Sequence, residues 1–200
     1  SIAVACISSN SFTPVLLYFT NCFVITDNTG NAVLIDASGD VDKIDKILKN
    51  DKAELKAILL THGHDDHRET LQRTVEMYHC PVYVGREDAK LFGFSHTHHY
   101  TDGEHLTFGE IKLYAFGTPG HTPGSYCFIC EDMLFSGDTL FAGTVGRTDL
   151  EGGDWEQLNE SLKKLLSVVK TDLKVLPGHE GFSTFWAEKT HNPYLVKAGE

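Results

Sequence analysis

The stretch Thr61-His-Gly-His-Asp-Asp-His67 decides how this chain is expected to fold. It directly follows the apolar run of residues 55–60, which predicts a short buried strand. Residues i and i+2 of an extended backbone point to the same side, so His62 and His64 could bind one metal ion. Where the chain curls after the strand, Asp66 and His67 could face a second ion. Some of the 11 histidines must be ordinary surface residues, but a solvated face rarely gathers donors this densely.

Three further motifs carry potential metal ligands. They are Gly117-Thr-Pro-Gly-His121, Ser136-Gly-Asp138 and Pro177-Gly-His179, and each follows an apolar segment and contains glycine. This pattern is typical of strand ends that lead into loops, and loops at one edge of a sheet can converge. A lone His121 or His179 would more often be structural. Together with the first stretch, these motifs bring five imidazoles and two carboxylates, which is more than one tetrahedral zinc can use. The set suits two metals that share a bridging carboxylate.

Hydrophobic periodicity predicts strands and helices in two batches. Strands are expected at residues 15–19, 22–26, 31–35, 55–60, 81–84, 106–108, 111–116, 126–129, 133–135 and 173–176. Helices are expected at residues 41–48, 68–79, 86–91 and 155–169, with Asp40 as N-cap of the first. The hairpins at 106–116 and 126–135 imply antiparallel pairs, which do not fit a simple parallel doubly wound sheet. Two mixed sheets packed face to face, with helices outside, fit better.

The seven potential ligands, taken in chain order, resemble the metallo-β-lactamase superfamily. The signature of that superfamily is His-x-His-x-Asp-His, followed by His, Asp and His, and the match runs from about residue 22 to residue 195. Residues 136–149 and the closing Asn192-Pro-Tyr-Leu195 resemble the short glyoxalase II-like (hydroxyacylglutathione hydrolase-like) branch. The resemblance implies an α/β fold, a four-layer αββα sandwich with the metal site at one edge between the sheets. Residues 1–200 are then one metallo-hydrolase domain without a separate C-terminal helical substrate domain.

The resemblance also implies the role of each ligand. The first metal would be bound by His62, His64 and His121, the second by Asp66, His67 and His179, and Asp138 would bridge the two. The carboxylates expected to take part in catalysis are Asp66 and Asp138. Imidazole and carboxylate ligands suit two divalent ions, with zinc favoured and iron or manganese as alternatives. The dense group His96, His98 and His99, in the polar stretch 93–103, is interpreted as a mobile surface loop, with an auxiliary metal site or a flap over the active site as alternatives.

The function implied by the resemblance is hydrolysis of a thioester, typically an S-2-hydroxyacylglutathione, by a metal-bound hydroxide. Arg147 is the candidate for binding a carboxylate of the small-molecule substrate, and a structural pairing with Asp149 is the alternative. Two departures from the family pattern affect the mouth of the site. Arg68-Glu69-Thr70 stands where a small pair is usual, and Glu180-Gly181 follows the last histidine.

Other functions on the same fold stay open at this point. The nearest is a persulfide dioxygenase that holds one Fe(II) through His62, His121 and Asp138. A metal-dependent phosphodiesterase is a further alternative, and a binding module without catalysis is a third. All seven ligands are present, which favours two metals and an enzyme.

Composition limits the partners and the compartment. The 200 residues with 41% apolar content suffice for one domain with a substantial core. The formal charge of −11 argues against nucleic acid and against anionic membranes. Cys127 and Cys130 lie in a predicted strand and would face opposite sides, so the 5 cysteines are interpreted as buried free thiols in a reducing compartment. No basic leader and no apolar run of membrane-spanning length is seen, so a cytoplasmic location is expected. The sequence does not indicate an oligomeric state.

Overall fold

A first six-stranded sheet is built from the N-terminal half of the chain. The computed structural model describes residues 1–12 and 17–200, and the side chains of residues 1–8 and 19–200. The strands of this sheet, in spatial order, are β1 (Ile2–Phe12), β2 (Leu17–Asp27), β3 (Asn31–Ile35), β4 (Glu54–Leu59), β5 (Val82–Val84) and β6 (His98–His99). From β1 to β3 the neighbours are antiparallel, and from β3 to β6 they are parallel.

A second six-stranded sheet follows in the C-terminal half. Its strands, in spatial order, are β14 (Ser183–Thr184), β13 (Lys174–Pro177), β10 (Met133–Gly137), β9 (Tyr126–Cys130), β8 (Ile111–Gly117) and β7 (Glu104–Phe108). All neighbours are antiparallel except β10 and β13, which run parallel. A two-stranded ribbon of β11 (Leu140–Phe141) and β12 (Thr144–Val145) lies beside it. Both hairpins expected from the sequence are present.

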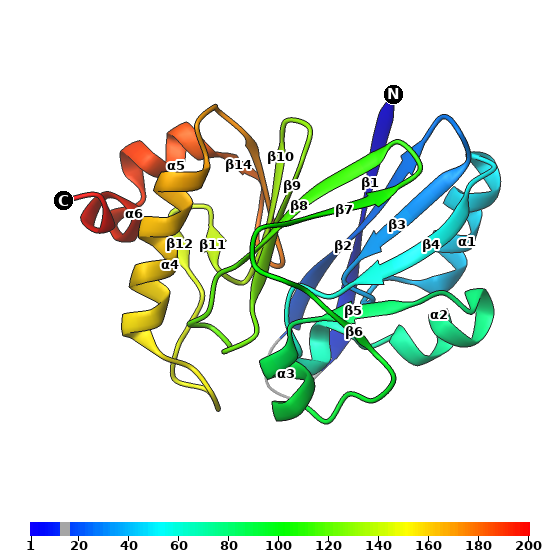
Figure 1. Cartoon of the computed structure of the whole chain (residues 1–200), viewed down its shortest axis with the longest axis horizontal. Coiled ribbons are helices and arrows are strands. Elements are labelled where there is room, and N and C mark those ends of the chain that lie inside the picture. The colour runs from blue at the N-terminus through cyan, green and yellow to red at the C-terminus, as the bar shows by residue number, and fades with distance from the viewer. Residues whose placement is uncertain (13–16) are drawn as a thin grey trace.

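Helices cover the outer faces of the two sheets. On the first sheet lie α1 (Val41–Asn50), α2 (Leu71–Tyr78) and α3 (Arg86–Leu91), while α4 (Trp155–Val168), α5 (Phe185–His191) and α6 (Pro193–Ala198) lie on the second. Figure 1 shows the two sheets facing each other between these helical layers. The predicted fold class, a four-layer sandwich of two mixed sheets with helices outside, is therefore confirmed.

The alternation of side chains along each strand divides the core into layers. In β2, Phe23 and Ile25 face the second sheet, whereas Cys22 and Val24 face the helices of the first. The layer between the sheets takes residues from both halves, including Ile35, Leu59, Leu113, Phe128 and Phe135. A third layer joins the second sheet to its helices through Phe116, Leu162, Leu165, Phe185 and Leu195. Because both faces of the central strands are buried, these strands read as near-continuous apolar runs.

Several element boundaries differ from those expected. The segments 15–19 and 22–26, expected as two strands, belong to the single strand β2 from Leu17 onward, and residues 15 and 16 lie outside the described residues. The polar residues Thr20 and Asn21 continue this strand, and both side chains are buried. The helix expected at 68–79 begins only at Leu71, because residues 65–67 form a 3₁₀ turn, η1 (Asp65–His67). The expected N-cap Asp40 is confirmed, since its side chain accepts a hydrogen bond from the Asp42 amide at 2.9 Å.

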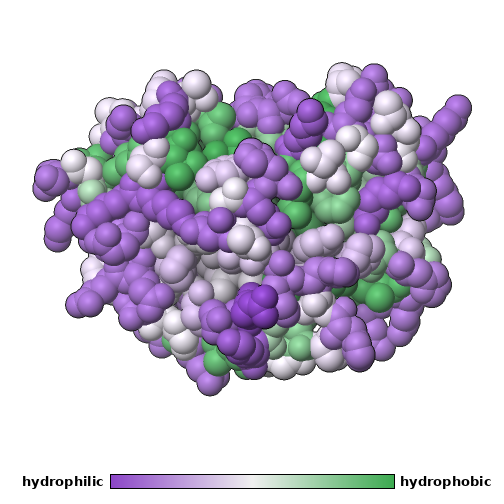
Figure 2. Space-filling model, in the orientation of Figure 1, coloured by the Kyte–Doolittle hydropathy of each residue, from purple (hydrophilic) through white to green (hydrophobic). Residues whose placement is uncertain are grey.

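The cysteines are free thiols, as expected. Cys127 lies in the layer against the helices and Cys130 in the layer between the sheets, so their thiols do face opposite sides. Cys6 is exposed, so the expectation of a buried thiol was wrong for this residue. The face of the molecule in Figure 2 is mostly hydrophilic, with apolar areas interspersed. Of the helices within residues 1–12 and 17–200, none has the length and apolar character needed to span a bilayer.

Candidate metal centre

Four strands of the two sheets deliver the predicted ligands to one edge of the sandwich. His62 and His64 follow β4, His121 follows β8, Asp138 follows β10 and His179 follows β13. Because β10 and β13 are parallel, with Gly137 beside Pro177, the residues that come next emerge together. The Nε2 atom of His179 lies 3.3 Å from Oδ2 of Asp138.

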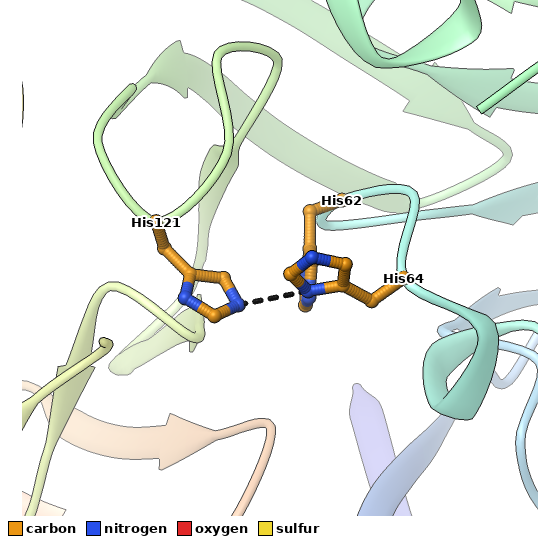
Figure 3. Close-up of side chains that lie close together, drawn as sticks. All are labelled: His62, His64 and His121. Atoms are coloured by element: carbon orange, nitrogen blue, oxygen red, sulfur yellow. Dashed lines mark hydrogen bonds between the residues drawn. The ribbon is translucent and has the colours of Figure 1, made fainter. Parts of the chain in front are cut away.

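His62, His64 and His121 form one cluster, called here the three-histidine group. Their rings point toward one another from two separate loops, as Figure 3 shows. His64 Nδ1 and His121 Nε2 are 3.0 Å apart, and the rings of His62 and His121 lie at 4.8 Å between centroids. The extended backbone at His64 supports the expectation that residues i and i+2 face one side.

Asp66, His67 and His179 form the second cluster, called here the Asp66 group. Here the 3₁₀ turn η1 curls the chain, so that Asp66 and His67 reach His179, while the rings of His67 and His62 lie 4.1 Å apart between centroids. His179 Nε2 lies 3.1 Å from Asp66 Oδ2 and 3.2 Å from His67 Nε2. The structure thus brings together the ligands that the sequence assigned to each ion.

Asp138 stands between the two groups. Its Oδ2 atom is 3.3 Å from His121 Nε2 and 3.9 Å from His62 Nε2, and its Oδ1 atom is 3.3 Å from His67 Nε2. Only 8% of Asp138 is exposed. A buried carboxylate that faces imidazoles of both groups has the position that a bridging ligand requires.

The remaining ring nitrogens of the histidines are held by the surrounding chain. Nδ1 of His67 lies 2.7 Å from Oδ2 of Asp36, and Nδ1 of His62 lies 3.0 Å from the Thr61 hydroxyl. Nδ1 of His121 lies 2.7 Å from the Arg147 carbonyl, and Nδ1 of His179 lies 2.8 Å from the Phe19 carbonyl. Such contacts fix ring orientation and direct the other nitrogen toward a metal.

Asp36 is a functional residue that the sequence reasoning missed. It is buried at the end of β3 and accepts hydrogen bonds from the Thr61 amide at 2.8 Å and the Thr61 hydroxyl, besides its contact with His67. Its φ of +58° is a left-handed conformation, which aspartate tolerates better than most residues. The available signal was an aspartate placed directly after a buried apolar strand.

The orphaned polar atoms of the cluster fit a metal. His62 Nε2 and Asp138 Oδ1 are buried and have no hydrogen-bond partner, although buried polar groups are nearly always satisfied. Both atoms point into the cluster, where a cation would satisfy them. A Cβ atom at Gly178 would lie 2.3 Å from Asp138 Oδ1 and 2.5 Å from His67 Cε1, so any other residue would fill this space. The donor set of imidazoles and carboxylates suits divalent transition metals.

The electrostatics of the cluster agree with that interpretation. Burial and the nearby His67 lower the pKa of His62, and burial and His121 lower the pKa of His64 to about 4, so both rings are neutral at pH 7. Burial alone would also lower the pKa of His179, but hydrogen bonds to Asp138 and Asp66 raise it to about 10. The pKa of Asp138 stays well below its usual range, because His67 and His62 outweigh burial. The carboxylates therefore draw positive charge into the cluster, and protons and metal cations compete to supply it.

An open cleft of about 1120 Å³ lies over the two groups. Its lining outside the ligands is partly apolar and partly acidic: Ser8, Phe19, Asn21, Asp65, Glu69, Phe141, Thr144, Val145, Arg147, Leu150, Glu180 and Gly181. Arg147 is in this lining, and its guanidinium binds Asp149 through two hydrogen bonds of 2.6 and 2.7 Å. The pairing foreseen as the alternative is thus present, and a role of Arg147 in binding substrate stays a prediction.

The C-terminal helices support one wall of the cleft. The side-chain amide of Asn192 donates to the backbone carbonyls of Phe141 and Thr144. The backbone amide of Gly143 donates to the Glu188 carboxylate at 2.8 Å. Asn192 is also the N-cap of α6, where it accepts from Tyr194 and Leu195. The closing Asn-Pro-Tyr-Leu motif therefore fixes the β11–β12 ribbon and, with it, the apolar wall.

The second histidine-rich stretch takes no part in the site. His98 stacks on Tyr83 at 4.9 Å, and His99 Nδ1 lies 3.3 Å from the Val84 carbonyl, where both residues form strand β6. Within the described parts of the chain, each group of side chains close enough to share an ion belongs to the cluster above. The expectation of a surface loop at 93–103 was therefore wrong for the short strand within it.

Comparisons with known proteins place these features in a family. The family model described as "Metallo-beta-lactamase superfamily" matches residues 15–179. An uncharacterized Mycobacterium leprae protein is 36% identical over 202 residues, which cover 88% of this chain and 93% of that protein. The hydroxyacylglutathione hydrolase GloC of Haemophilus influenzae is 30% identical over 202 residues, covering 91% of this chain and 95% of GloC.

Solved structures agree with the fold. The BLEG-1 B3 metallo-β-lactamase superposes with a TM-score of 0.82 at 31% identity, covering 97% of this chain and all 100% of that chain. ETHE1 from Myxococcus xanthus gives a TM-score of 0.81 at 28% identity, with 97% and 85% covered. TTHA1623, solved in a di-iron-bound form, gives 0.76 at 31% identity, with 92% and 98% covered.

We expect the purified chain to bind about two metal ions, because each ligand group with its share of Asp138 supplies the donors that one ion needs. Elemental analysis by mass spectrometry, on protein that has not met a chelator, measures this number. No more than one transition metal per chain, even after reconstitution, would rule out the binuclear site.

We expect Asp138→Ala to reduce metal occupancy and turnover more than the loss of any single histidine ligand. The carboxylate faces imidazoles of both groups, whereas each histidine is assigned to one ion. The variant should lose metal occupancy and nearly all turnover, with the five single histidine-to-alanine variants as matched references. If Asp138→Ala keeps both metals and near-normal turnover, the residue is not the bridge.

Proposed function

Because this chain belongs to the metallo-β-lactamase superfamily, we propose that it is a metal-dependent hydrolase of thioesters, with S-2-hydroxyacylglutathiones as the substrate class. One observation carries the proposal. Two ligand groups that share Asp138 lie at the bottom of an open cleft, and the order and spacing of the ligands match the family signature. The similarity to a hydroxyacylglutathione hydrolase supports the choice of substrate.

The residues of the centre provide positions for two cations, zinc being favoured. When bound, two such ions supply a water of lowered pKa and polarise the acyl carbonyl. The chain supplies the rest: Asp36 and Thr61 keep the rings of His67 and His62 oriented, and Asp138 keeps the two groups in contact. Since the ligands are fixed by buried contacts before substrate arrives, little reorganisation is needed during the reaction.

A thioester suits this site better than an amide. The leaving thiol has a pKa of about 8.5, so it departs as a thiolate with little help from an acid. An amide nitrogen needs a proton donor. The histidines at the bottom of the cleft are assigned to the metals and are not available as proton donors. The arrangement therefore favours substrates whose leaving group requires no proton.

A cysteine nucleophile is not supported. None of the described cysteines lines the cleft. Burial raises the pKa of Cys127 to about 11 and that of Cys22 to about 12, so these thiols are protonated at neutral pH and unreactive. The chemistry is therefore assigned to the metal centre and its water.

The wall of the cleft offers little to the glutathione moiety. Arg147, the basic residue in the described lining, already binds Asp149, while Asp65, Glu69 and Glu180 add negative charge. Phe141, Val145 and Leu150 form an apolar wall instead. Glutathione carries two carboxylates, which these groups do not complement. Binding energy from the thiol part of the substrate should therefore be small.

We expect hydrolysis of S-lactoylglutathione with a high KM and only a modest preference over a lactoyl thioester of a simple neutral thiol. The comparison of kcat/KM for the two substrates tests this, since the reacting acyl carbon is the same in both. A kcat/KM for the glutathione thioester that is more than roughly a thousandfold higher would show a dedicated glutathione pocket. This ratio corresponds to about 4 kcal/mol, at about 1.36 kcal/mol for each factor of ten.

The same assay separates the proposal from its rival. If neither thioester is hydrolysed and the protein consumes oxygen with glutathione persulfide, the hydrolase proposal is wrong and the chain is an iron-dependent dioxygenase. Asp138→Ala is the control in both assays, because it should abolish either activity and leave contaminating enzymes unaffected.

A further inference from the structure

Asp88 is a buried carboxylate outside the ligand set that joins two ligand loops. It lies in α3, and its side chain is fully buried. Its Oδ2 atom accepts hydrogen bonds from the Gly63 amide and the Thr122 hydroxyl, both at 2.7 Å, and its Oδ1 atom accepts from the Gly124 amide at 2.6 Å. Gly63 stands between His62 and His64.

These contacts connect the two halves of the three-histidine group. The loop of Gly63 belongs to the first sheet, whereas Thr122 and Gly124 lie in the loop of the second sheet that carries His121. A single carboxylate thus holds both loops, next to the place where His64 Nδ1 and His121 Nε2 approach to 3.0 Å. A shift of either loop relative to Asp88 would change that separation.

Both ligand loops pack directly against α3, which restricts the distance between His64 and His121. A Cβ atom at Gly63 would come within 2.2 Å of the Phe92 ring, and one at Gly124 within 2.5 Å of the Asp88 amide nitrogen. A Cβ atom at Gly85, just before α3, would come within 2.1 Å of the Gly124 carbonyl oxygen. Glycine at these positions allows the backbones to touch, and the carboxylate then locks them.

The Asp66 group has different supports. His67 is held by Asp36, and the loop of His179 is held by Asn21, whose side chain donates to the carbonyls of Pro177 and Glu180 at 3.0 and 3.1 Å. The Gly178 carbonyl also accepts from the Asn21 amide at 2.7 Å. None of these contacts involves Asp88. Asp88 therefore positions the three-histidine group alone, whereas Asp36 holds His67 directly and also reaches His62 through the Thr61 hydroxyl.

We propose that Asp88 is a positioning residue that sets the distance between His64 and His121 and so determines how tightly the three-histidine group binds its metal, independently of the Asp66 group. This proposal rests on the metal binding assumed under the proposed function. Asp88 itself belongs to neither ligand group.

The chemistry of the three donors explains why a carboxylate is needed. Each of the three partners donates, so the residue must accept on both oxygens. Burial raises the pKa of Asp88, and the hydrogen bonds from Thr122, Gly63 and Gly124 oppose that rise. An asparagine would turn an NH₂ group toward at least one of these donors and leave a buried N–H or O–H unsatisfied.

The test compares Asp88→Asn with Thr122→Val, which removes one of the three donors at nearly constant shape, and with Thr122→Ser, which keeps the hydroxyl. Purified holo-protein is dialysed against increasing chelator, and the metal retained per chain is counted. The variant His64→Ala, which lacks one ligand of the three-histidine group, is the reference that identifies which of the two ions is lost. Asp88→Asn and Thr122→Val should weaken the ion of that group about 10- to 100-fold and leave the other unchanged. Thr122→Ser should match the wild type.

Asp27→Asn is the matched structural control. Asp27 is also buried, and it accepts from the backbone amides of Asn31 and Glu110, but it lies six residues along β2 from Asn21, about 20 Å away. This variant should lower Tm without weakening either metal. If Asp88→Asn fails to fold, the metal affinity of Thr122→Val still tests the proposal.

The proposal is overturned if Asp88→Asn and Thr122→Val bind both ions as the wild type does, if they weaken both ions equally, or if Asp27→Asn weakens the same ion. Wild-type protein that holds no metal at all would instead overturn the proposed function on which this inference rests.

Discussion

The burial of Asp138 among imidazoles is the interaction on which the rest of this structure depends. A carboxylate that is 8% exposed must be compensated by nearby positive charge or by donors, and here these come from both ligand groups. To bring them within reach, four strand ends from two sheets must open onto one edge, with β10 and β13 in parallel register. Gly178 has no side chain that would fill the space beside Asp138 and His67, and the contact with Asp36 orients the His67 ring toward that space. The sandwich is the scaffold that satisfies these demands together.

Much of the fold and of the ligand set could be predicted because the relevant information is local. Alternation along β2 to β4, helical spacing along α4 and hairpin turns are patterns of neighbouring residues, and so is the cluster from His62 to His67. The residues that were missed have no such pattern. Asp36, Asn21 and Asp88 are single polar residues whose side-chain partners lie 13 to 159 positions away, so only the folded chain shows what they hold. Strand β1 escaped notice because its small and polar side chains give weak alternation.

Different supports for the two ligand groups suggest a division of labour. Asp88 holds the loops of the three-histidine group, while Asp36 and Asn21 hold the Asp66 group. Asp138 contacts both groups, and Asp36 also reaches His62 through the Thr61 hydroxyl. Such an arrangement allows the affinity of one site to change through a residue that contacts neither metal nor substrate, while the other site and the cleft wall supported by Asn192 stay as they are.

Each ligand group draws two donors from the first sheet and one from the second. A bound ion would therefore crosslink the two sheets, and the free energy of metal binding would add to the stability of the folded protein. The order of the donors along the chain has a further consequence during synthesis. When His67 leaves the ribosome, four donors exist but neither group is complete. The first can close only after His121 emerges, and the second only after His179. Metal capture by either complete group thus has to wait until strands of both sheets have been synthesised.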